Sequence, residues 1–325
     1  PAVCAPICSK NNRIKYGYTM LLFKKNTNGA ICKIKEKPFK LEREIQRLFE
    51  QNLSTIMNLE LVRSEFTIKD RRIDTLAFDP QSKSFVIIEY KRDRNTSVFD
   101  QGITYLNLML QHKADFIVEY NECKKKQLKR TDVDWSQTRV AFVSPNFTEN
   151  QIMATDFRDF SIELWEVKQY ENGVIAITPI QKSKTAESIK QFAGENVALK
   201  TVAEEIKTYT EEDQLQGKSE DVIALYERYK TAILNLSDAI EVSAKKLYIA
   251  FKKEGRNIVD VEIRKNGLKL YLNAKKGTLD DPKKLARDVS EVGHWGNGDY
   301  VINLVDDSNL EYIMSLIKFL LKSAL

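Results

Sequence analysis

The chain has 325 residues, of which 42% are apolar and 30% are charged. This length predicts about two domains with buried cores, and the composition excludes a wholly disordered protein. Lysine and arginine outnumber aspartate and glutamate by 51 to 46, which permits a polyanionic partner without requiring one. No run approaches the roughly 18 apolar residues of a membrane span, so we expect no membrane-spanning segment and a cytoplasmic location. The four cysteines form no C-x-x-C pair and only two histidines occur, which argues against a zinc site.

The first part of the chain shows no clear hydrophobic period. We expect Met20 to be the natural start and residues 1–19 to be an upstream extension, the alternative being a poorly ordered native arm. Residues 20–39 then predict two short strands around a turn at Asn28-Gly29.

Helical spacing of apolar residues predicts an amphipathic helix over 40–53. Its apolar stripe consists of Leu41, Ile45, Leu48, Phe49 and Leu53. Runs rich in Ile, Val and Phe predict strands, with a turn at 79–82 between the second and the third. These strands cover 59–68, 71–79, 84–92, 114–120, 138–147, 161–170 and 173–180. Further helices are predicted over 98–113 and 148–157.

The element order αβββαβαβ mixes strands and helices, which favours an α/β fold with a mixed sheet flanked by helices. We expect this first domain to cover residues 20–180. Residues 181–219 are rich in Lys, Glu, Gln and Thr and indicate a polar linker or an exposed helical connector. Residues 220–325 predict a C-terminal α+β domain of unknown role.

Three charged residues lie in the second and third predicted strands. Asp74 lies within one strand, and Glu89 and Lys91 end the next, where they share a face because side chains alternate along a strand. If the two strands pair through the turn, Asp74 reaches the same end of the sheet. Converging carboxylates bind hard divalent cations such as Mg²⁺, and a lysine beside them can orient water or stabilise a transition state. The alternative is an ordinary Glu/Lys pair on an exposed edge.

Two helices supply further candidates. Glu42 falls at the border of the first helix's apolar stripe and can be a third carboxylate at the site. The register of the helix leaves Glu44 as the other candidate for this role. The alternative is that Glu42 is simply an N-terminal glutamate favoured by the helix dipole. Gln101 and Tyr105 lie at i and i+4 on one face of the later helix. They can hold a phosphate or a base, or simply pack at a helix start.

The phrases LEREIQRLFEQNL, RRIDTLAFD, FVIIEYKRD and DQGITYL resemble the PD-(D/E)xK nuclease superfamily, in its RecB-like and NucS-like branch. The resemblance covers about residues 35–170 and implies a restriction-endonuclease-like fold with an αβββαβ core that cleaves DNA with Mg²⁺ or Mn²⁺. It implies that Glu42, Asp74 and Glu89 are metal ligands and that Lys91 is the catalytic lysine. Gln101 and Tyr105 match the family's Gln/Tyr helix motif, and the name-giving Pro-Asp is Ile73-Asp74 here.

Other basic residues are candidates for phosphate contact. Arg72 and Arg92 flank the predicted site and are the better placed. The basic run 124–130 can also contact phosphate, or be a solvated loop. The stretch GHWGNGDY, at 293–300, indicates either a binding loop or a tight turn with Trp295 as a packing anchor. The C-terminal segment 220–325 resembles an uncharacterised domain often fused to such nucleases.

The leading hypothesis is therefore a metal-dependent DNA endonuclease, in DNA repair or in defence and restriction. Cutting of two strands would favour a homodimer. The alternatives are a catalytically silent nucleic-acid-binding module with the same fold, and a subunit whose C-terminal domain docks a protein partner.

Overall fold

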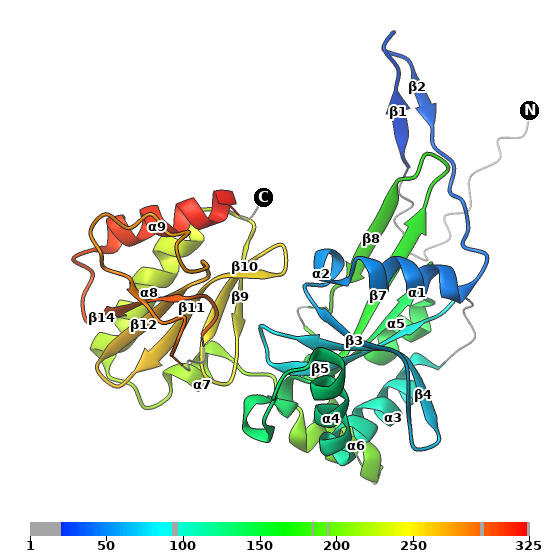
Figure 1. The fold of residues 1–325 in the computed structure, drawn as a ribbon, viewed down its shortest axis with the longest axis horizontal. Coiled ribbons are helices and arrows are strands. Elements are labelled where there is room, and N and C mark those ends of the chain that lie inside the picture. The colour runs from blue at the N-terminus through cyan, green and yellow to red at the C-terminus, as the bar shows by residue number, and fades with distance from the viewer. Residues whose placement is uncertain are drawn as a thin grey trace, which may run out of the picture.

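The computed structural model describes residues 21–92, 97–183, 185–192, 194, 196–292 and 296–323. The expected extension at 1–19, with Met20, and His294 and Trp295 of the glycine-rich stretch lie outside the described residues. Within those ranges the chain forms two six-stranded sheets, which pack in separate hydrophobic cores, and one two-stranded ribbon (Figure 1). No helix in the described ranges has the length and apolar character needed to cross a bilayer.

The first sheet has the strand order β3-β4-β5-β6-β7-β8. Its strands are β3 (Glu60–Ile68), β4 (Arg71–Asp79), β5 (Ser84–Tyr90), β6 (Arg139–Ser144), β7 (Ile162–Gln169) and β8 (Ile175–Ile180). The pairs β3–β4, β4–β5 and β7–β8 are antiparallel, whereas β5–β6 and β6–β7 are parallel. The expected mixed sheet is therefore present, and β5 lies inside it.

Helices cover both faces of this sheet. One face packs on α1 (Glu42–Gln51) and α2 (Leu53–Ile56). The other packs on α3 (Val98–Gln111), α4 (Lys113–Lys124), α5 (Glu149–Thr155) and α6 (Val197–Glu205). Alternation along β5 explains the two cores, since Phe85 and Ile87 face α3 and α4 while Val86 and Ile88 face α1. All seven residues of β5 are buried, as its apolar run predicts.

Two expectations about the first unit are wrong. The strand expected at 114–120 is part of α4, whose buried residues Phe116, Ile117 and Tyr120 lie at helical spacing. A short apolar run does not by itself distinguish a strand from a helix, and here packing on β3 decides it. Leu41, expected in the apolar stripe of the first helix, is 60% exposed because it is the N-cap residue rather than a helical one.

The interval 181–219 contains helices as well as irregular chain. Besides α6 it holds α7 (Glu211–Leu215) and the 3₁₀ turn η3 (Ile189–Phe192), and two further 3₁₀ turns, η1 (Arg130–Asp132) and η2 (Trp135–Gln137), precede β6. In α6, Leu199 and Val202 are buried in the core that α3 shares. The amide of Asn107 on α3 donates to the carbonyl oxygen of Ala198 at 3.0 Å. Residues 197–205 therefore pack on the first sheet.

The second sheet has the order β13-β14-β12-β11-β10-β9 and is antiparallel throughout. Its strands are β9 (Ile240–Ala244), β10 (Ile249–Lys253), β11 (Arg256–Arg264), β12 (Gly267–Leu272), β13 (Arg287–Asp288) and β14 (Tyr300–Leu304). Its core lies against α8 (Glu220–Leu234) and α9 (Leu310–Ser323). We call residues 211–323 the C-terminal unit, and the chain before them the N-terminal unit.

The described part of the glycine-rich stretch packs onto this second sheet. A Cβ on Gly296 would lie 2.2 Å from the ring of Tyr271, and one on Gly298 would lie 2.1 Å from the carbonyl oxygen of Leu272. Between them, the main-chain and side-chain amides of Asn297 donate to the fully buried Asp260 at 2.7 and 2.8 Å. Close packing thus accounts for both described glycines, in line with the turn alternative.

The two-stranded ribbon stands apart from both sheets. It pairs β1 (Phe23–Lys25) with β2 (Ile31–Lys33) around the expected turn, in which Gly29 has φ +85°. Figure 1 shows it projecting from the N-terminal unit beyond the end of β7 and β8. It is attached there by the chain that follows, because the amide of Lys37 donates to the carbonyl oxygen of Gln169 at 2.8 Å.

Candidate active site

The end of β5 brings together a carboxylate and an amine. Glu89 is 2% exposed, and the amine Nζ of Lys91 lies 3.2 Å from its Oε2. The two side chains share a face, as strand alternation predicts, and that face is the one covered by α3. Burying a charged pair at the end of a strand costs free energy unless the pair is hydrogen-bonded. The groups that contact Glu89 and Lys91 therefore determine whether the pair is stable there.

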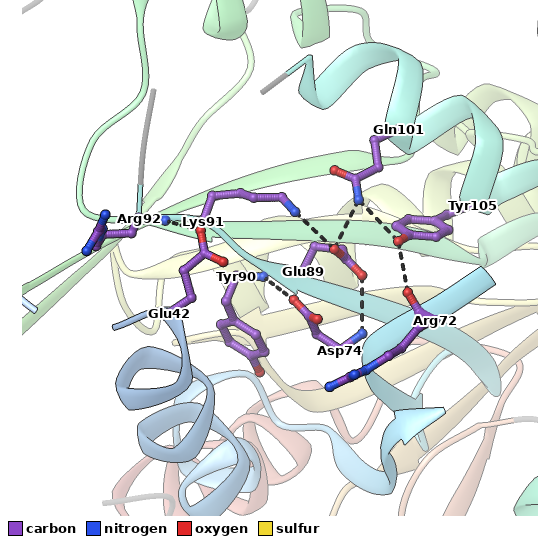
Figure 2. Close-up of polar contacts among 9 residues, drawn as sticks. All are labelled: Glu42, Arg72, Asp74, Glu89, Tyr90, Lys91, Arg92, Gln101 and Tyr105. Atoms are coloured by element: carbon purple, nitrogen blue, oxygen red, sulfur yellow. Dashed lines mark hydrogen bonds and ion pairs between the residues drawn. The ribbon is translucent and has the colours of Figure 1, made fainter. Parts of the chain in front are cut away.

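Asp74 on β4 lies directly beside this pair. Its main-chain amide donates to Glu89 Oε1 at 3.2 Å, and its Oδ2 accepts from the amide of Tyr90 at 3.1 Å (Figure 2). These bonds cross between adjacent antiparallel strands, which is the pairing that the turn at 79–82 predicts. The carboxylates of Asp74 and Glu89 therefore meet at one end of the sheet.

Glu42, the first residue of α1, lies at the same end. Its Oε1 accepts from the amide of Arg92 at 2.8 Å, directly after Lys91. Glu44 instead points back along its own helix start, where its Oε2 accepts from the amide of Lys40 at 2.9 Å. Of the two candidates in this helix, the structure brings Glu42 to the cluster and leaves Glu44 bonded to the chain just before the helix.

Gln101 and Tyr105 reach the cluster from α3. Gln101 Nε2 donates to Glu89 Oε2 and to the Tyr105 hydroxyl, each at 3.1 Å. The Tyr105 hydroxyl in turn donates to the carbonyl oxygen of Arg72 at 3.3 Å. α3 begins just before Gln101, where Ser97 caps it by accepting from the amide of Asp100. The first turn of α3 thus places Gln101 within hydrogen-bonding distance of Glu89.

The two arginines expected at phosphate have other partners in this structure. The guanidinium of Arg72 forms an ion pair with Glu65 at 2.6 Å, and that of Arg92 donates to the carbonyl oxygen of Lys40 at 2.9 Å. Both lie next to the carboxylates, because Arg72 is two residues before Asp74 and Arg92 directly follows Lys91. Their contact with phosphate stays a prediction.

The basic run at 124–130 lies at the other end of the sheet. Lys126 forms an ion pair with Glu60 at 3.5 Å, and Glu60 is paired with Phe78, four residues beyond Asp74 on β4. At about 3.3 Å per residue this places Glu60 roughly 13 Å along the strands from Asp74. The arrangement favours the solvated-loop alternative for this run.

Burial and like charge raise the pKa values of both central carboxyls. The pKa of Asp74 is raised mainly by burial, opposed by the bond from the Tyr90 amide and by Lys91, and raised further by Glu42. The pKa of Glu89 is raised mainly by burial and then by the charge of Asp74, with Lys91 opposing. The positive charge of Lys91 therefore does not balance the negative charges of Asp74, Glu89 and Glu42.

A second row of polar residues supports the site and is not identified by the motif. Gln46 on α1 donates to the carbonyl oxygen of Asp74 at 3.0 Å and to Glu50 Oε1 at 3.1 Å. Glu50 also accepts from the hydroxyl of Thr75 at 2.5 Å. The signal in the sequence is the i, i+4 ladder of Glu42, Gln46 and Glu50 along one helix side. These bonds fix α1 against the strand that carries Asp74.

The residues present fit a hard divalent cation in part. Among the described residues, no three His, Cys, Asp or Glu side chains are grouped closely enough to hold a metal ion by themselves. Mg²⁺, however, is commonly bound by one or two carboxylates, with waters and substrate phosphates completing its six oxygen ligands. Asp74 and Glu89 supply two, and Gln101 Oε1 is a buried acceptor without a hydrogen-bond partner. That orphaned oxygen suits a water molecule beside the carboxylates.

Comparison with known proteins gives one strong match and three partial ones. A family model described as a domain of unknown function, DUF5655, matches residues 211–319. Two solved structures show a low likeness: a repair endonuclease from Pyrococcus abyssi (19% identity, 36% of this chain and 43% of that chain, TM-score 0.21) and the EndoMS–dsDNA2 complex (14%, 40% and 57%, TM-score 0.19). The chain spans about half the length of these two, and TM-scores of this size do not establish a shared fold.

The strong match is to an uncharacterized protein of Haemophilus influenzae (strain ATCC 51907 / DSM 11121 / KW20 / Rd). The two are 55% identical over 294 residues, which is 90% of this chain and 97% of that protein. The match therefore extends over most of both units. With this identity over nearly the whole of both proteins, the chain belongs to the same family as the Haemophilus influenzae protein.

Proposed function

We propose that this protein is a divalent-metal-dependent endonuclease that hydrolyses phosphodiester bonds in DNA, with its active site at the carboxylate cluster. One observation carries the proposal: Asp74 and Glu89 are held side by side in a buried place where both pKa values are raised, with a single lysine beside them. Structural ion pairs are normally balanced, whereas a site with excess buried negative charge is suited to a cation.

In this proposal Asp74 and Glu89, with Glu42 at the border, hold Mg²⁺ or Mn²⁺. The bound metal would lower the pKa of a water and offset charge on the phosphate. Lys91 lies on the same face as Glu89, so its amine can bind a non-bridging phosphate oxygen or orient the attacking water. Gln101 positions Glu89 by donating to it, and its unpartnered Oε1 can accept a hydrogen bond from that water.

A phosphodiester is the substrate that this chemistry best suits. A neutral substrate would leave the charge of a bound dication and of Lys91 without an anionic partner, whereas a phosphate brings oxygen ligands of opposite charge. Arg72 and Arg92 beside the cluster provide further cations for a nucleic-acid backbone, once their present partners are exchanged. The choice of DNA over RNA follows from the resemblance of the sequence motifs to DNA nucleases.

The test is cleavage of plasmid and single-stranded DNA by the full chain with Mg²⁺, Mn²⁺ or EDTA. We expect metal-dependent cleavage that is lost in Asp74→Asn and in Glu89→Gln, because each removes a charged oxygen ligand. Binding of Mn²⁺, followed by electron paramagnetic resonance, should weaken in the same variants and gives a readout apart from activity. Gel filtration with and without DNA reports whether two copies assemble for two-strand cutting.

A matched control is Glu44→Gln, which changes a carboxylate in the first turn of the same helix that does not join the cluster. This variant should cleave like the parent, whereas Glu42→Gln should lose activity. If the parent binds duplex DNA but does not cleave it with any metal, the protein is a binding module with this site silent. If Glu89→Gln cleaves as well as the parent, the active site lies elsewhere.

A further inference from the structure

The ribbon of β1 and β2 combines exposed lysines with exposed apolar side chains. Every residue of both strands is exposed, including Phe23 at 47% and Ile31 at 64%. Register places Phe23 opposite Lys33 and Ile31 opposite Lys25. Residues directly opposite share a face, so one face of the ribbon carries two apolar side chains and two lysines. Nothing else in the described chain covers that face.

The charge of this segment has one sign. Residues 21–37 contain five exposed lysines and one exposed acidic residue, Glu36. The lysines are Lys24, Lys25, Lys33, Lys35 and Lys37. A two-stranded hairpin is at best marginally stable by itself in water, so this ribbon is expected to gain stability from a partner. A partner that suits five lysines is a polyanion.

The chain connects the ribbon directly to the candidate active site. From Lys33, at the end of β2, seven residues lead to Lys40, whose carbonyl oxygen accepts from the guanidinium of Arg92. Seven residues span at most about 25 Å. Duplex DNA rises 3.4 Å per base pair, so the base of the ribbon lies within about seven base pairs of Lys40, the residue that contacts Arg92 beside the cluster.

We propose that the β1–β2 ribbon is a DNA-binding arm that enters the major groove of a duplex whose backbone lies at the carboxylate cluster. The major groove admits a two-stranded ribbon, its walls are lined with phosphates for the lysines, and thymine methyl groups offer apolar contact for Phe23 and Ile31. The inference rests on the proposed function and adds to it that the substrate is double-stranded on the ribbon side of the site.

A second copy of this chain is the competing occupant. Two such ribbons placed edge to edge would bring lysines of one copy beside lysines of the other, and like charges on neighbouring strands are destabilising. Charge therefore favours DNA over self-association.

The test is binding of the full chain to a 30-base-pair duplex in EDTA, where no cleavage occurs, at several salt concentrations. The ribbon variant is Lys24→Gln, Lys25→Gln, Lys33→Gln. Its matched control, Lys124→Gln, Lys129→Gln, Arg130→Gln, removes the same charge from the basic run at the far end of the sheet. We expect the ribbon variant to bind about 10- to 100-fold more weakly at 0.1 M salt, with a salt slope lower by about 2 to 3, since each phosphate contact contributes about 0.9. The control should match the parent.

The outcomes separate this inference from the proposed function. DNA binding that depends on the ribbon, in a protein that never cleaves, would support the arm and reject the endonuclease. Metal-dependent cleavage with unchanged binding and slope in the ribbon variant would reject the arm and keep the endonuclease. A parent that does not bind the duplex, or a ribbon variant that only changes a dimer into a monomer in sedimentation, would also overturn the arm. Far-UV circular dichroism establishes that each variant is folded.

Discussion

The hydroxyl of Tyr248 donates a 2.7 Å hydrogen bond to the carbonyl oxygen of Gln81. The two residues belong to different sheets, because Tyr248 directly precedes β10 of the C-terminal unit and Gln81 lies in the turn between β4 and β5. That turn joins the strand of Asp74 to the strand of Glu89. Asn297, from the glycine-rich stretch, donates to the same hydroxyl at 3.2 Å. The C-terminal unit thus contacts the connection between the two central carboxylate strands.

Removing this hydroxyl should loosen the turn. We expect Tyr248→Phe to lower the free energy of unfolding by about 1 kcal/mol, the usual net value of such a bond, and to speed hydrogen exchange at the amides of 81–84. Hydrogen-exchange mass spectrometry measures the second effect. Tyr229→Phe is the matched control, because its hydroxyl donates to the carbonyl oxygen of Asp306 within the C-terminal unit. Equal exchange at the turn in both variants would contradict the prediction.

The stability of the protein should carry a pH signature from Asp260. Burial is the main cause that raises the pKa of this carboxyl to about 6, although Asn297 and Asn257 donate to it. An unfolded aspartate titrates near pH 4. Between about pH 4 and pH 6 the folded state therefore holds a proton that the unfolded state has lost. The contribution of Asp260 to stability is greatest below pH 4, falls as the pH rises to 6, and is constant above.

Comparison with Asp260→Asn isolates that signature. Thermal unfolding between pH 4 and pH 7 should show a smaller loss of stability with rising pH in the variant than in the parent. Asp280→Asn changes an exposed carboxylate of the same unit and should leave the parent's profile unchanged. Parallel profiles for the parent and Asp260→Asn would show that this carboxyl does not titrate in the range.

Lys91 should stabilise the protein chiefly in the absence of metal. Its side chain is 18% exposed and that of its partner Glu89 is 3% exposed, so Lys91→Met leaves two nearby carboxylates without their closest cation. We expect a loss of about 2 kcal/mol in EDTA, within the range for unpairing a partly buried charge. A bound ligand stabilises the folded state. Mg²⁺ should raise the melting temperature of Lys91→Met more than that of the parent, because in the variant the cation replaces the positive charge that the carboxylates have lost.

The control for this prediction is the double variant Glu89→Ala, Lys91→Met. It lacks the second carboxylate, so Mg²⁺ should change its melting temperature least of the three proteins. Differential scanning calorimetry at matched ionic strength makes the comparison. An equal response of all three proteins to Mg²⁺ would place cation binding outside the cluster.

Gly102 allows α3 to approach the sheet. A Cβ at this position would lie 2.0 Å from Cδ1 of Ile162 on β7, inside the core. Gly102→Ala should therefore destabilise by about 1–3 kcal/mol, the cost of overpacking, although alanine is the better helix former. Ile162→Val removes that methyl group, so the double variant should recover part of the loss. A double-mutant cycle in urea measures the coupling, and additive effects would contradict it.

Much of the cluster's assembly is predictable because it depends on local rules. Strand alternation places Glu89 and Lys91 on one face, and the turn at 79–82 pairs β4 with β5, so Asp74 follows. The helical stripe brings Glu42 to the border of the buried face, where it accepts from Arg92. The catalytic role of these residues stays a prediction, since proximity alone does not show chemistry.

Other features depend on packing between distant segments, which local rules do not encode. The bond from Gln46 to Asp74 joins residues 28 apart, and Lys126 reaches Glu60 across 66 positions of the chain. The helix at 113–124 forms because its apolar residues meet β3 and β4, whereas the short run by itself also suits a strand. Tertiary contacts therefore determine that residues 113–124 form a helix, although the local sequence is also compatible with a strand.

Every side chain of the candidate site lies between Glu42 and Tyr105, and the last helix packed on the sheet around it, α6, ends at Glu205. A ribosome adds roughly 5–20 residues per second, and domains generally fold in the order of their synthesis. The carboxylates are therefore expected to be in place on the nascent chain several seconds before the residue that contacts their turn, Tyr248, has been made. During that interval the turn at Gln81 lacks its hydrogen bond from Tyr248. The rate of translation therefore determines how long the N-terminal unit is folded without contact from the C-terminal unit.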